Sequence, residues 1–586
     1  MIALDRLSVG TIAAAVRSGQ RRAGDIIDEV LERLAAYDAV QSAVWIARFD
    51  AGALRAAAAS VDARVAAGEV LPLAGVPFAI KDNIDVAGLA TTAACPAFSY
   101  LPERSASVVE RLVAAGAIPI GKTNLDQFAT GLNGTRSPYG IPRNAYNRAY
   151  VSGGSSSGSA VAVAAGLVAF ALGTDTAGSG RVPAAFNQLV GLKPTRGRWS
   201  NRGLVPACRT LDCVTVLAGT VDDAAAIDDI VAGYDAEDAF SRAMPDLARP
   251  VRRIGVPRQD QRPWFGNLES AQLFDRAIAA LDAEIVEIDM TPLNAAARLL
   301  YDGPWVAERA AALRQLLQDD PAAIHPVVRD VVSPGLTYSA VDAFDGLYHL
   351  AELARAAQAL WSDIDLIAAP TAPTCYRVSE MLAAPIALNA HLGAYTNFVN
   401  LLDMAAIALP AGTYASGVGF GITLIGPAGS DRALIDAASV FGAAVAPPAL
   451  DLEGRMETVK LAVVGAHLKD MPLHWQLTSR EARFVGEAMT APAYRLYAMT
   501  DSVPPKPALI HTGGEESGGA SIALEIYELD VAAFGSFVAE VPPPLAIGTV
   551  TLADGSLVKG FVAEPRAIAN AEDITALGGW RAYMRG

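Results

Sequence analysis

Three segments of this 586-residue chain carry side chains that could together cleave an amide bond. Lys81 follows an apolar run in LAGVPFAIKDNIDVAG, Ser155 lies in VSGGSSSGSA, and Ser179 lies in GTDTAGSGRVPAAF. A serine hydroxyl becomes a good nucleophile only when a base takes its proton. The first histidine of the chain is His325, well beyond these segments, so the question is which other group accepts that proton.

The three segments resemble those of the amidase signature family. Its members read GGSS-x-G-S, then G-T-D-x-[GA]-G-S-x-R-x-P, then G-L-K-P-T. The matching stretches here are residues 153–159, 173–184 and 191–195. The resemblance extends over about residues 8–445. It implies that Ser179 is the nucleophile, that Ser155 relays the proton from a cis peptide, and that Lys81 is the base.

A lysine amine can act as this base once it has lost its proton. Its pKa is about 10.4 in water, and burial lowers it because an apolar environment disfavours the ammonium form. A pKa of about 7 or 8 corresponds to on the order of 4 kcal/mol of differential solvation. We therefore expect Lys81 to be buried, with Ser155 passing it the proton of Ser179.

The residues just before the nucleophilic serine have small side chains and are expected to form a turn. We expect the backbone N–H groups of Thr176, Ala177 and Gly178 to converge on the oxyanion that develops during acyl transfer. Asp175 and Arg181 also match family positions, and we interpret them as a buried structural pair.

Two further motifs match known catalytic patterns, but their context argues against both. GAIPIGKT, residues 116–123, satisfies the phosphate-binding P-loop pattern, yet a helix precedes Gly116 and the next residues suit a buried strand. GSSSG, residues 154–158, matches a nucleophile elbow with Ser156 at its tip, yet no clear strand precedes it. We expect a strand at the first and a glycine-serine loop at the second.

A later part of the chain points to the substrate. LLYDGPWVAERAA and GAYTNFVNLLDMAAIALPAG resemble the allophanate hydrolases, which hydrolyse urea-1-carboxylate in ATP-dependent urea breakdown or triazine-ring catabolism. In that family a tyrosine and an arginine eight residues apart hold the substrate carboxylate, which implies Tyr301 and Arg309 here. Such a spacing puts both near one face of a helix, and a guanidinium binds a carboxylate bidentately. The alternative is a surface arginine on an amphipathic helix.

The chain changes character near residues 446–458, which are rich in proline and charge and predict a linker. Short strand-like runs follow and predict a small α+β domain over residues 459–586. This part resembles the C-terminal domain of allophanate hydrolases and the γ-glutamylcyclotransferase-like fold. The resemblance implies decarboxylation of the first product, N-carboxycarbamate, with His467 and His474 as candidates. The alternative is a broad amidase whose extra domain serves only dimerisation or docking.

The elements that must position these groups fit an α/β fold. Residues 8–67 are predicted to be helical, with Ser8 as an N-cap, and from Leu73 short β-branched runs alternate with helical stretches. We expect residues 1–445 to form the catalytic domain. The resemblance implies the amidase-signature fold, a central mixed β-sheet covered by helices on both faces.

The amino-acid composition limits the expected binding partners and the cellular compartment of the protein. A formal charge of −16 disfavours nucleic acid and anionic membrane surfaces, so an anionic substrate needs a local cation. Four cysteines fit a reducing compartment, and Cys208 and Cys213 lack nearby histidines, so neither a metal nor another cofactor is expected. The N-terminal pattern is not that of a signal peptide. We expect a cytoplasmic homodimer with a functional link to a urea carboxylase.

Overall fold

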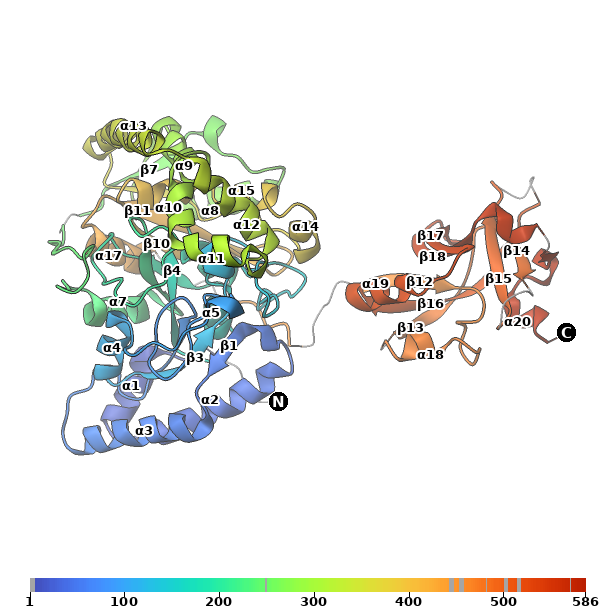
Figure 1. The fold of residues 1–586 in the computed structure, drawn as a ribbon, viewed down its shortest axis with the longest axis horizontal. Coiled ribbons are helices and arrows are strands. Elements are labelled where there is room, and N and C mark those ends of the chain that lie inside the picture. The colour runs from blue at the N-terminus through green and yellow to red at the C-terminus, as the bar shows by residue number, and fades with distance from the viewer. Residues whose placement is uncertain are drawn as a thin grey trace. The chain divides into compact units, whose positions relative to one another are not determined.

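The computed structural model forms two compact units, Met1–Gly454 and Arg455–Gly586, which are described separately (Figure 1). The described residues are 6–247, 250–441, 447–452, 458–480, 482–499, 504–513, 518–569 and 571–585. The linker predicted at 446–458 lies partly outside them. Its residue Asp451 belongs to the first unit, because the Asp451 carboxylate accepts a hydrogen bond from the amide of Arg148 at 3.0 Å.

An 11-stranded mixed sheet forms the centre of the first unit, as the family resemblance implied (Figure 1). The strand order is β1-β3-β2-β4-β6-β5-β10-β11-β9-β7-β8. β2 runs parallel to both β3 and β4, whereas β6, β5, β10, β11 and β9 are joined by antiparallel pairs. The strands are β1 (Trp45–Arg48), β2 (Pro77–Lys81), β3 (Ile118–Thr123), β4 (Phe170–Asp175), β5 (Val190–Lys193), β6 (Cys213–Ala218), β7 (Arg253–Pro257), β8 (Glu284–Ile288), β9 (Leu366–Pro370), β10 (Ala405–Thr413) and β11 (Gly419–Gly426).

Every residue of β2, β4, β6, β9 and β11 is buried, which shows that helices and loops cover both faces of this sheet. Such strands read as continuous apolar runs rather than as an alternating pattern. The helices are α1 (Val9–Arg17), α2 (Ala23–Asp38), α3 (Ala51–Ala66), α4 (Ser107–Ala114), α5 (Ser157–Ala164), α6 (Arg181–Phe186), α7 (Val221–Val231), α8 (Leu268–Ala279), α9 (Thr291–Asp302), α10 (Trp305–Ala312), α11 (Arg314–Asp319), α12 (Pro326–Val332), α13 (Ala340–Gln358), α14 (Val378–Ala383), α15 (Ala387–Leu392), α16 (Asn397–Leu401) and α17 (Asp431–Phe441).

The N-terminal region differs from the prediction in one element. Ser8 is the N-cap of α1, and its hydroxyl accepts from the amide of Thr11 at 3.4 Å, as expected. The predicted helical stretch is however interrupted by β1, which pairs antiparallel with β3. This strand is only four residues long, and pairing with a distant strand decides its conformation rather than local periodicity.

The structure confirms the strand expected at GAIPIGKT and the loop expected at GSSSG. The lysine of GAIPIGKT, Lys122, lies in β3 and is fully buried, with Nζ 3.0 Å from a carboxylate oxygen of Asp82. Ser156 directly precedes α5, and its hydroxyl donates to the carbonyl of Thr174 at 3.2 Å. Neither motif forms the site that its pattern describes.

The second unit is an α+β domain, as predicted, with one five-stranded sheet and one three-stranded sheet. The strand orders are β13-β16-β12-β18-β17 and β15-β14-β19. Its elements are β12 (Thr458–Val463), α18 (Trp475–Thr478), β13 (Arg483–Met489), β14 (Tyr494–Met499), β15 (Lys506–His511), β16 (Ala523–Asp530), α19 (Val531–Ala539), β17 (Leu545–Thr551), β18 (Leu557–Ala563), β19 (Glu572–Asp573) and α20 (Trp580–Tyr583). Within the described ranges of both units, every helix is too short or too polar to cross a membrane.

Candidate active site

Lys81 is the last residue of β2, the strand that lies between β3 and β4 in the sheet. Its side chain is fully buried, and Nζ donates hydrogen bonds to Ser155 Oγ and to Thr174 Oγ1, each at 2.7 Å. Burial lowers the pKa of this amine to about 7, although three nearby carboxylates act in the opposite direction. Lys81 is thus buried as expected, and its environment favours the neutral amine, the form that can accept a proton.

Ser155 lies in the glycine-serine loop that leads into α5. The peptide bond between Gly154 and Ser155 is cis, as the family resemblance implied. The carbonyl of Ser155 accepts from the amide of Asp126 at 3.1 Å. A Cβ atom at Gly154 would overlap the Asp126 carboxylate, so these two segments approach closely only because this residue is glycine. The contacts hold the Ser155 hydroxyl against Lys81.

Ser179 lies in the turn between β4 and α6 and is 2% exposed. Its hydroxyl donates to the carbonyl of Gly131 at 3.4 Å, and its carbonyl accepts from the amide of Ser156 at 3.3 Å. Among the described residues no hydrogen bond joins the hydroxyls of Ser155 and Ser179. The three predicted residues thus lie in one buried region, with the Lys81–Ser155 bond formed. The proton relay also needs a hydrogen bond between Ser155 and Ser179. Catalytic hydrogen bonds of this kind often form or tighten only when substrate binds.

A buried ion pair holds the turn that contains Ser179. The Asp175 carboxylate accepts from Nε and Nη2 of Arg181, each at 2.9 Å, and both side chains are fully buried. Burial raises the pKa of Asp175, but the charge and hydrogen bonds of Arg181 bring it below its ordinary value. The structural interpretation of this pair is confirmed.

The amides of the same turn differ in their partners. The amide of Gly178 donates to Asp175 Oδ1 at 2.8 Å. The amides of Thr176 and Ala177 donate to no residue in the described part of the chain. Gly178 has a φ of +124°, and a Cβ atom there would overlap Thr396, so the turn requires glycine at this position. Two of the three amides expected at the oxyanion therefore have no acceptor among the described residues.

Tyr301 and Arg309 lie on two helices, α9 and α10, so the expectation that one helix carries both is wrong. Gly303 has an extended conformation because it precedes Pro304, and a residue before proline avoids the helical region. The two side chains nevertheless meet, since the guanidinium carbon of Arg309 lies 5.3 Å from the centroid of the Tyr301 ring. This is the distance of a cation–π contact.

Arg309 is 2% exposed, which rules out a surface arginine. Its Nη1 donates to Thr130 Oγ1 at 3.2 Å, while its Nε is buried and has no hydrogen-bond partner among the described residues. No carboxylate of the described chain forms an ion pair with it. A guanidinium carries five N–H donors, and only one hydrogen bond joins Arg309 to a described residue.

Sequence reasoning missed three residues that the fold brings to this region. Thr174 accepts a hydrogen bond from the amine of Lys81, which also donates to Ser155. It lies in the GTDT stretch of the motif that contains Ser179. Asp212 accepts from Thr176 Oγ1 at 2.5 Å, and burial raises its pKa to about 6. Thr130 contacts an arginine 179 positions further along the chain, so no local signal could have indicated its place.

The two histidines predicted in the second unit have structural contacts. The ring of His467 stacks on Phe561 with centroids 4.9 Å apart, and its Nε2 is hydrogen-bonded to Gln476 Oε1 at 2.8 Å. His474 Nε2 is hydrogen-bonded to the Tyr527 hydroxyl at 3.1 Å. Burial lowers the pKa of His467, so its ring is neutral near pH 7.

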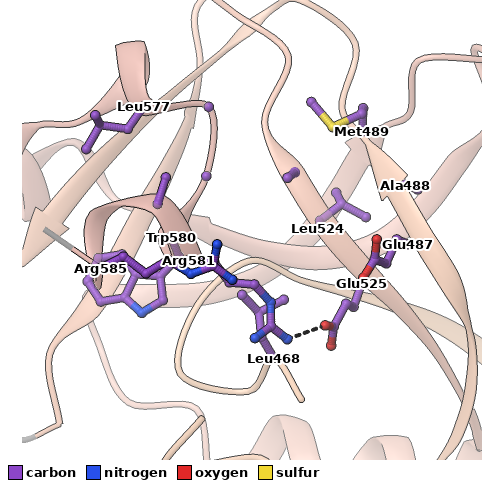
Figure 2. A pocket seen from close by; sticks show the side chains of 14 residues that line it. Leu468, Glu487, Ala488, Met489, Leu524, Glu525, Leu577, Trp580, Arg581 and Arg585 are labelled. Carbon is purple, nitrogen blue, oxygen red and sulfur yellow. Dashed lines mark hydrogen bonds and ion pairs between the residues drawn. The ribbon is translucent and has the colours of Figure 1, made fainter. Parts of the chain in front are cut away.

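A pocket of about 480 Å³ lies in the second unit and is lined by an ion pair between buried Glu525 and partly exposed Arg581 (Figure 2). Glu525 is 3% exposed and accepts from Arg581 Nη2 at 2.6 Å, from the amide of Lys469 at 2.8 Å and from the Tyr527 hydroxyl at 3.0 Å. Neither predicted histidine lines this pocket. His474 reaches Glu525 indirectly, through the hydroxyl of Tyr527.

Two protein-family models match the chain. Residues 25–435 match the amidase model. The chain belongs to the amidase family. Residues 459–585 match the model of the allophanate hydrolase C-terminal domain, so the second unit of this amidase carries a domain known from those enzymes.

Similar proteins extend this result. The chain is 44% identical to urea amidolyase of Saccharomyces cerevisiae over 551 residues, which cover 88% of this chain and 30% of that protein. It therefore spans less than a third of the length of such relatives. A glutamyl-tRNA(Gln) amidotransferase subunit of Lacticaseibacillus paracasei is 32% identical over 75% of this chain and 97% of its own. Among solved structures, Kluyveromyces lactis allophanate hydrolase matches with a TM-score of 0.71 and 40% identity, over 99% of both chains.

Proposed function

We propose that this amidase hydrolyses allophanate through an acyl-enzyme on Ser179. The observation that carries the proposal is Arg309, a buried guanidinium beside Tyr301 that has no carboxylate partner in the described chain. Its one hydrogen-bond partner, Thr130, adjoins Gly131, which accepts from the Ser179 hydroxyl. Allophanate carries a carboxylate close to its amide and so matches both groups. The similarity to Kluyveromyces lactis allophanate hydrolase supports the same substrate.

The proposed reaction begins with Lys81, the residue that accepts the proton. Neutral Lys81 takes a proton from Ser155, which takes one from Ser179 as the Ser179 oxygen attacks the amide carbon. The free amides of Thr176 and Ala177 stabilise the oxyanion. The proton then returns through Ser155 to the leaving nitrogen, and ammonia departs from the acyl-enzyme. Water attacks the resulting ester in the same way, which releases N-carboxycarbamate and restores the Ser179 hydroxyl.

The test compares substrates that differ in charge. We expect ammonia release from allophanate and malonamate, both anionic, with much higher kcat/KM than from neutral malonamide, because only the anions pair with the free guanidinium. Robust turnover of malonamide with none of allophanate would contradict the proposal and favour a broad amidase.

Activity should depend on pH through Lys81, whose pKa is lowered to about 7. Only the unprotonated amine accepts a proton, so kcat/KM for malonamide rises with pH up to about 7 and levels off above it. Well below the pKa of Lys81, kcat/KM falls about tenfold for each unit by which the pH is lowered. Malonamide is the right substrate because it has no group that titrates in this range. A flat profile from about pH 5 to about pH 9 would exclude this base.

We further propose that residues 459–586 decarboxylate N-carboxycarbamate, with residues 446–458 joining them to a catalytic domain of residues 1–445. The pocket at Glu525 and Arg581 supports this role, since its lining includes a cation that can bind a carboxylate. His474 would act through Tyr527, whereas the contacts of His467 suit a structural role.

Two variants of the full chain test the second step. In Glu525→Gln and Arg581→Met we expect the first ammonia from allophanate at the normal rate and a delayed second ammonia, as the carboxylated product accumulates. Glu487→Gln is the matched control, because Glu487 lines the same pocket but is exposed. An unchanged second step in both variants would favour a domain that serves only dimerisation or docking.

The remaining expectations also stay proposals. We propose a cytoplasmic homodimer that acts in urea breakdown with a urea carboxylase as functional partner. The similarity to urea amidolyases, proteins more than three times longer than the matched region, supports the link to urea. Light scattering of the intact chain measures the oligomeric state, and a monomer at all concentrations would contradict the dimer.

A further inference from the structure

Five arginines are buried in the described part of the protein, and they fall into two classes. Arg33, Arg148 and Arg181 each form an ion pair with a carboxylate. Arg136 and Arg309 are both 2% exposed and form none with a described residue. An unpaired buried charge is costly unless hydrogen bonds or a bound ion compensate it. These two residues therefore depend on hydrogen bonds, or on a bound anion, for compensation of their charge.

The two unpaired guanidiniums meet at one residue, Thr130. Arg136 donates to the carbonyl of Thr130 at 2.9 Å and to that of Pro385 at 2.6 Å. Arg309 donates to the hydroxyl of Thr130 at 3.2 Å. That hydroxyl donates its own hydrogen to the carbonyl of Phe128 at 3.2 Å, so its lone pairs face the guanidinium.

The conformation of this segment is fixed from its other end by Asp126. The Asp126 carboxylate accepts from the amide of Gly134 at 2.9 Å and from the amide of Arg136 at 2.9 Å. Residues 126–136 thus fold around one buried carboxylate. The next residue after Thr130, Gly131, accepts from the hydroxyl of the nucleophile. Two adjacent residues therefore contact the two groups of the proposed site: Thr130 contacts the Arg309 guanidinium, and Gly131 contacts the Ser179 hydroxyl.

The charge of Arg136 acts on the same site. Its pKa is lowered by burial and also by the neighbouring positive charge of Arg309, while Asp126 and Tyr301 act in the opposite direction. The positive charge of Arg309 therefore disfavours the charged form of Arg136, and an anion bound at Arg309 would offset that repulsion.

We propose that Thr130 and Arg136 are positioning residues that set the preference of this amidase for anionic amides. Thr130 aims the guanidinium of Arg309, and Arg136 clamps the backbone of Thr130 and adds positive charge. The segment thereby fixes how far the substrate carboxylate lies from the scissile carbonyl. This inference rests on the proposed function, because it assumes that Arg309 binds the carboxylate.

The experiment measures kcat and KM for malonamate and for malonamide in variants of the full chain. In Thr130→Val the ratio of kcat/KM for malonamate to that for malonamide falls about tenfold, mainly through the KM for malonamate, because a hydrogen bond to a charged group is lost. Thr130→Ser keeps the hydroxyl and restores most of the ratio. Arg136→Lys lowers the ratio too, since an ammonium cannot hold both carbonyls in the planar geometry of a guanidinium.

Thr135→Val is the matched control. Thr135 lies in the same segment and donates its hydroxyl to Asn133 at 2.7 Å, with no contact to Arg309, so the substrate ratio stays at its normal value. An unchanged ratio in Thr130→Val and Arg136→Lys overturns the inference, as does a Thr130→Ser ratio as low as that of Thr130→Val. Arg136→Lys alone decides the matter if Thr130→Val does not fold.

Failure of this inference differs from failure of the proposed function. If the unaltered protein does not prefer malonamate, the carboxylate site itself is absent. If it prefers malonamate and loses that preference in Arg309→Met but not in the Thr130 and Arg136 variants, only the positioning role is excluded.

Discussion

Replacing Ser179 with alanine should reduce ammonia release from allophanate, malonamate and malonamide by at least about 10⁴-fold, the scale of loss when a serine nucleophile is removed. The proposed reaction has no second route, because the carbonyl of every substrate must bond to the same oxygen. Lys81 and Ser155 remain in place in this variant, so the loss reports the nucleophile alone. The measurement is single-turnover ammonia release.

Ser156→Ala is the matched control for this variant. Ser156 is the tip of the GSSSG motif and is buried, and its hydroxyl donates to the carbonyl of Thr174. We expect this variant to lower the melting temperature, because Thr174 loses a buried partner, but to retain activity far above that of Ser179→Ala. If Ser156→Ala were inactive and Ser179→Ala active, the nucleophile would be the elbow serine instead.

Replacing Arg309 with methionine should lower kcat/KM for malonamate by about 10²-fold or more while changing that for malonamide far less, since a charge-assisted pair to the carboxylate is lost. Methionine fills most of the space beside Tyr301 without a charge. The exposed Arg298 of α9 gives the matched control, because Arg298→Met removes the same charge outside the site. Equal losses for both substrates would place Arg309 in the scaffold rather than in substrate binding.

The stability of this variant gives a second readout. Arg309→Met removes a buried cation that forms no ion pair with a described residue, although its charge also acts on the buried Asp212 carboxylate, so the free energy of unfolding should fall by less than when a close buried pair is broken. Arg181→Met would instead leave Asp175 buried without its cation and should cost about 3–5 kcal/mol. Thermal and urea unfolding of the two variants distinguish these cases. A large loss in Arg309→Met alone would indicate a structural role.

The oxyanion turn illustrates where prediction from sequence ends. Small residues before Ser179 predicted a turn with converging amides, and the turn is present between β4 and α6. Which amides are free could not be predicted, because Asp175 accepts from Gly178 only once Arg181 has fixed its carboxylate. The amides of Thr176 and Ala177 are the ones that donate to no described residue.

The break between α9 and α10 shows a different limit. The sequence contains the cause, since Gly303 and Pro304 stand between Tyr301 and Arg309, but an eight-residue spacing alone suggested one continuous helix. Helical periodicity reports spacing, whereas the proline decides where the helix ends. The two residues still meet because the two short helices pack so that the guanidinium lies over the ring.

The sequence by itself was enough to predict the α/β class and the second domain from local patterns, and the resemblance of its contiguous motifs to the amidase signature family implied the set Lys81, Ser155 and Ser179. The sequence also favoured a buried strand over a P-loop at Lys122, as the structure shows. Only the tertiary structure decided that Arg309 is buried without an ion pair to any described carboxylate and that Thr130 receives two guanidiniums. Burial and ion pairing depend on contacts between residues far apart in the chain, and no local pattern encodes them.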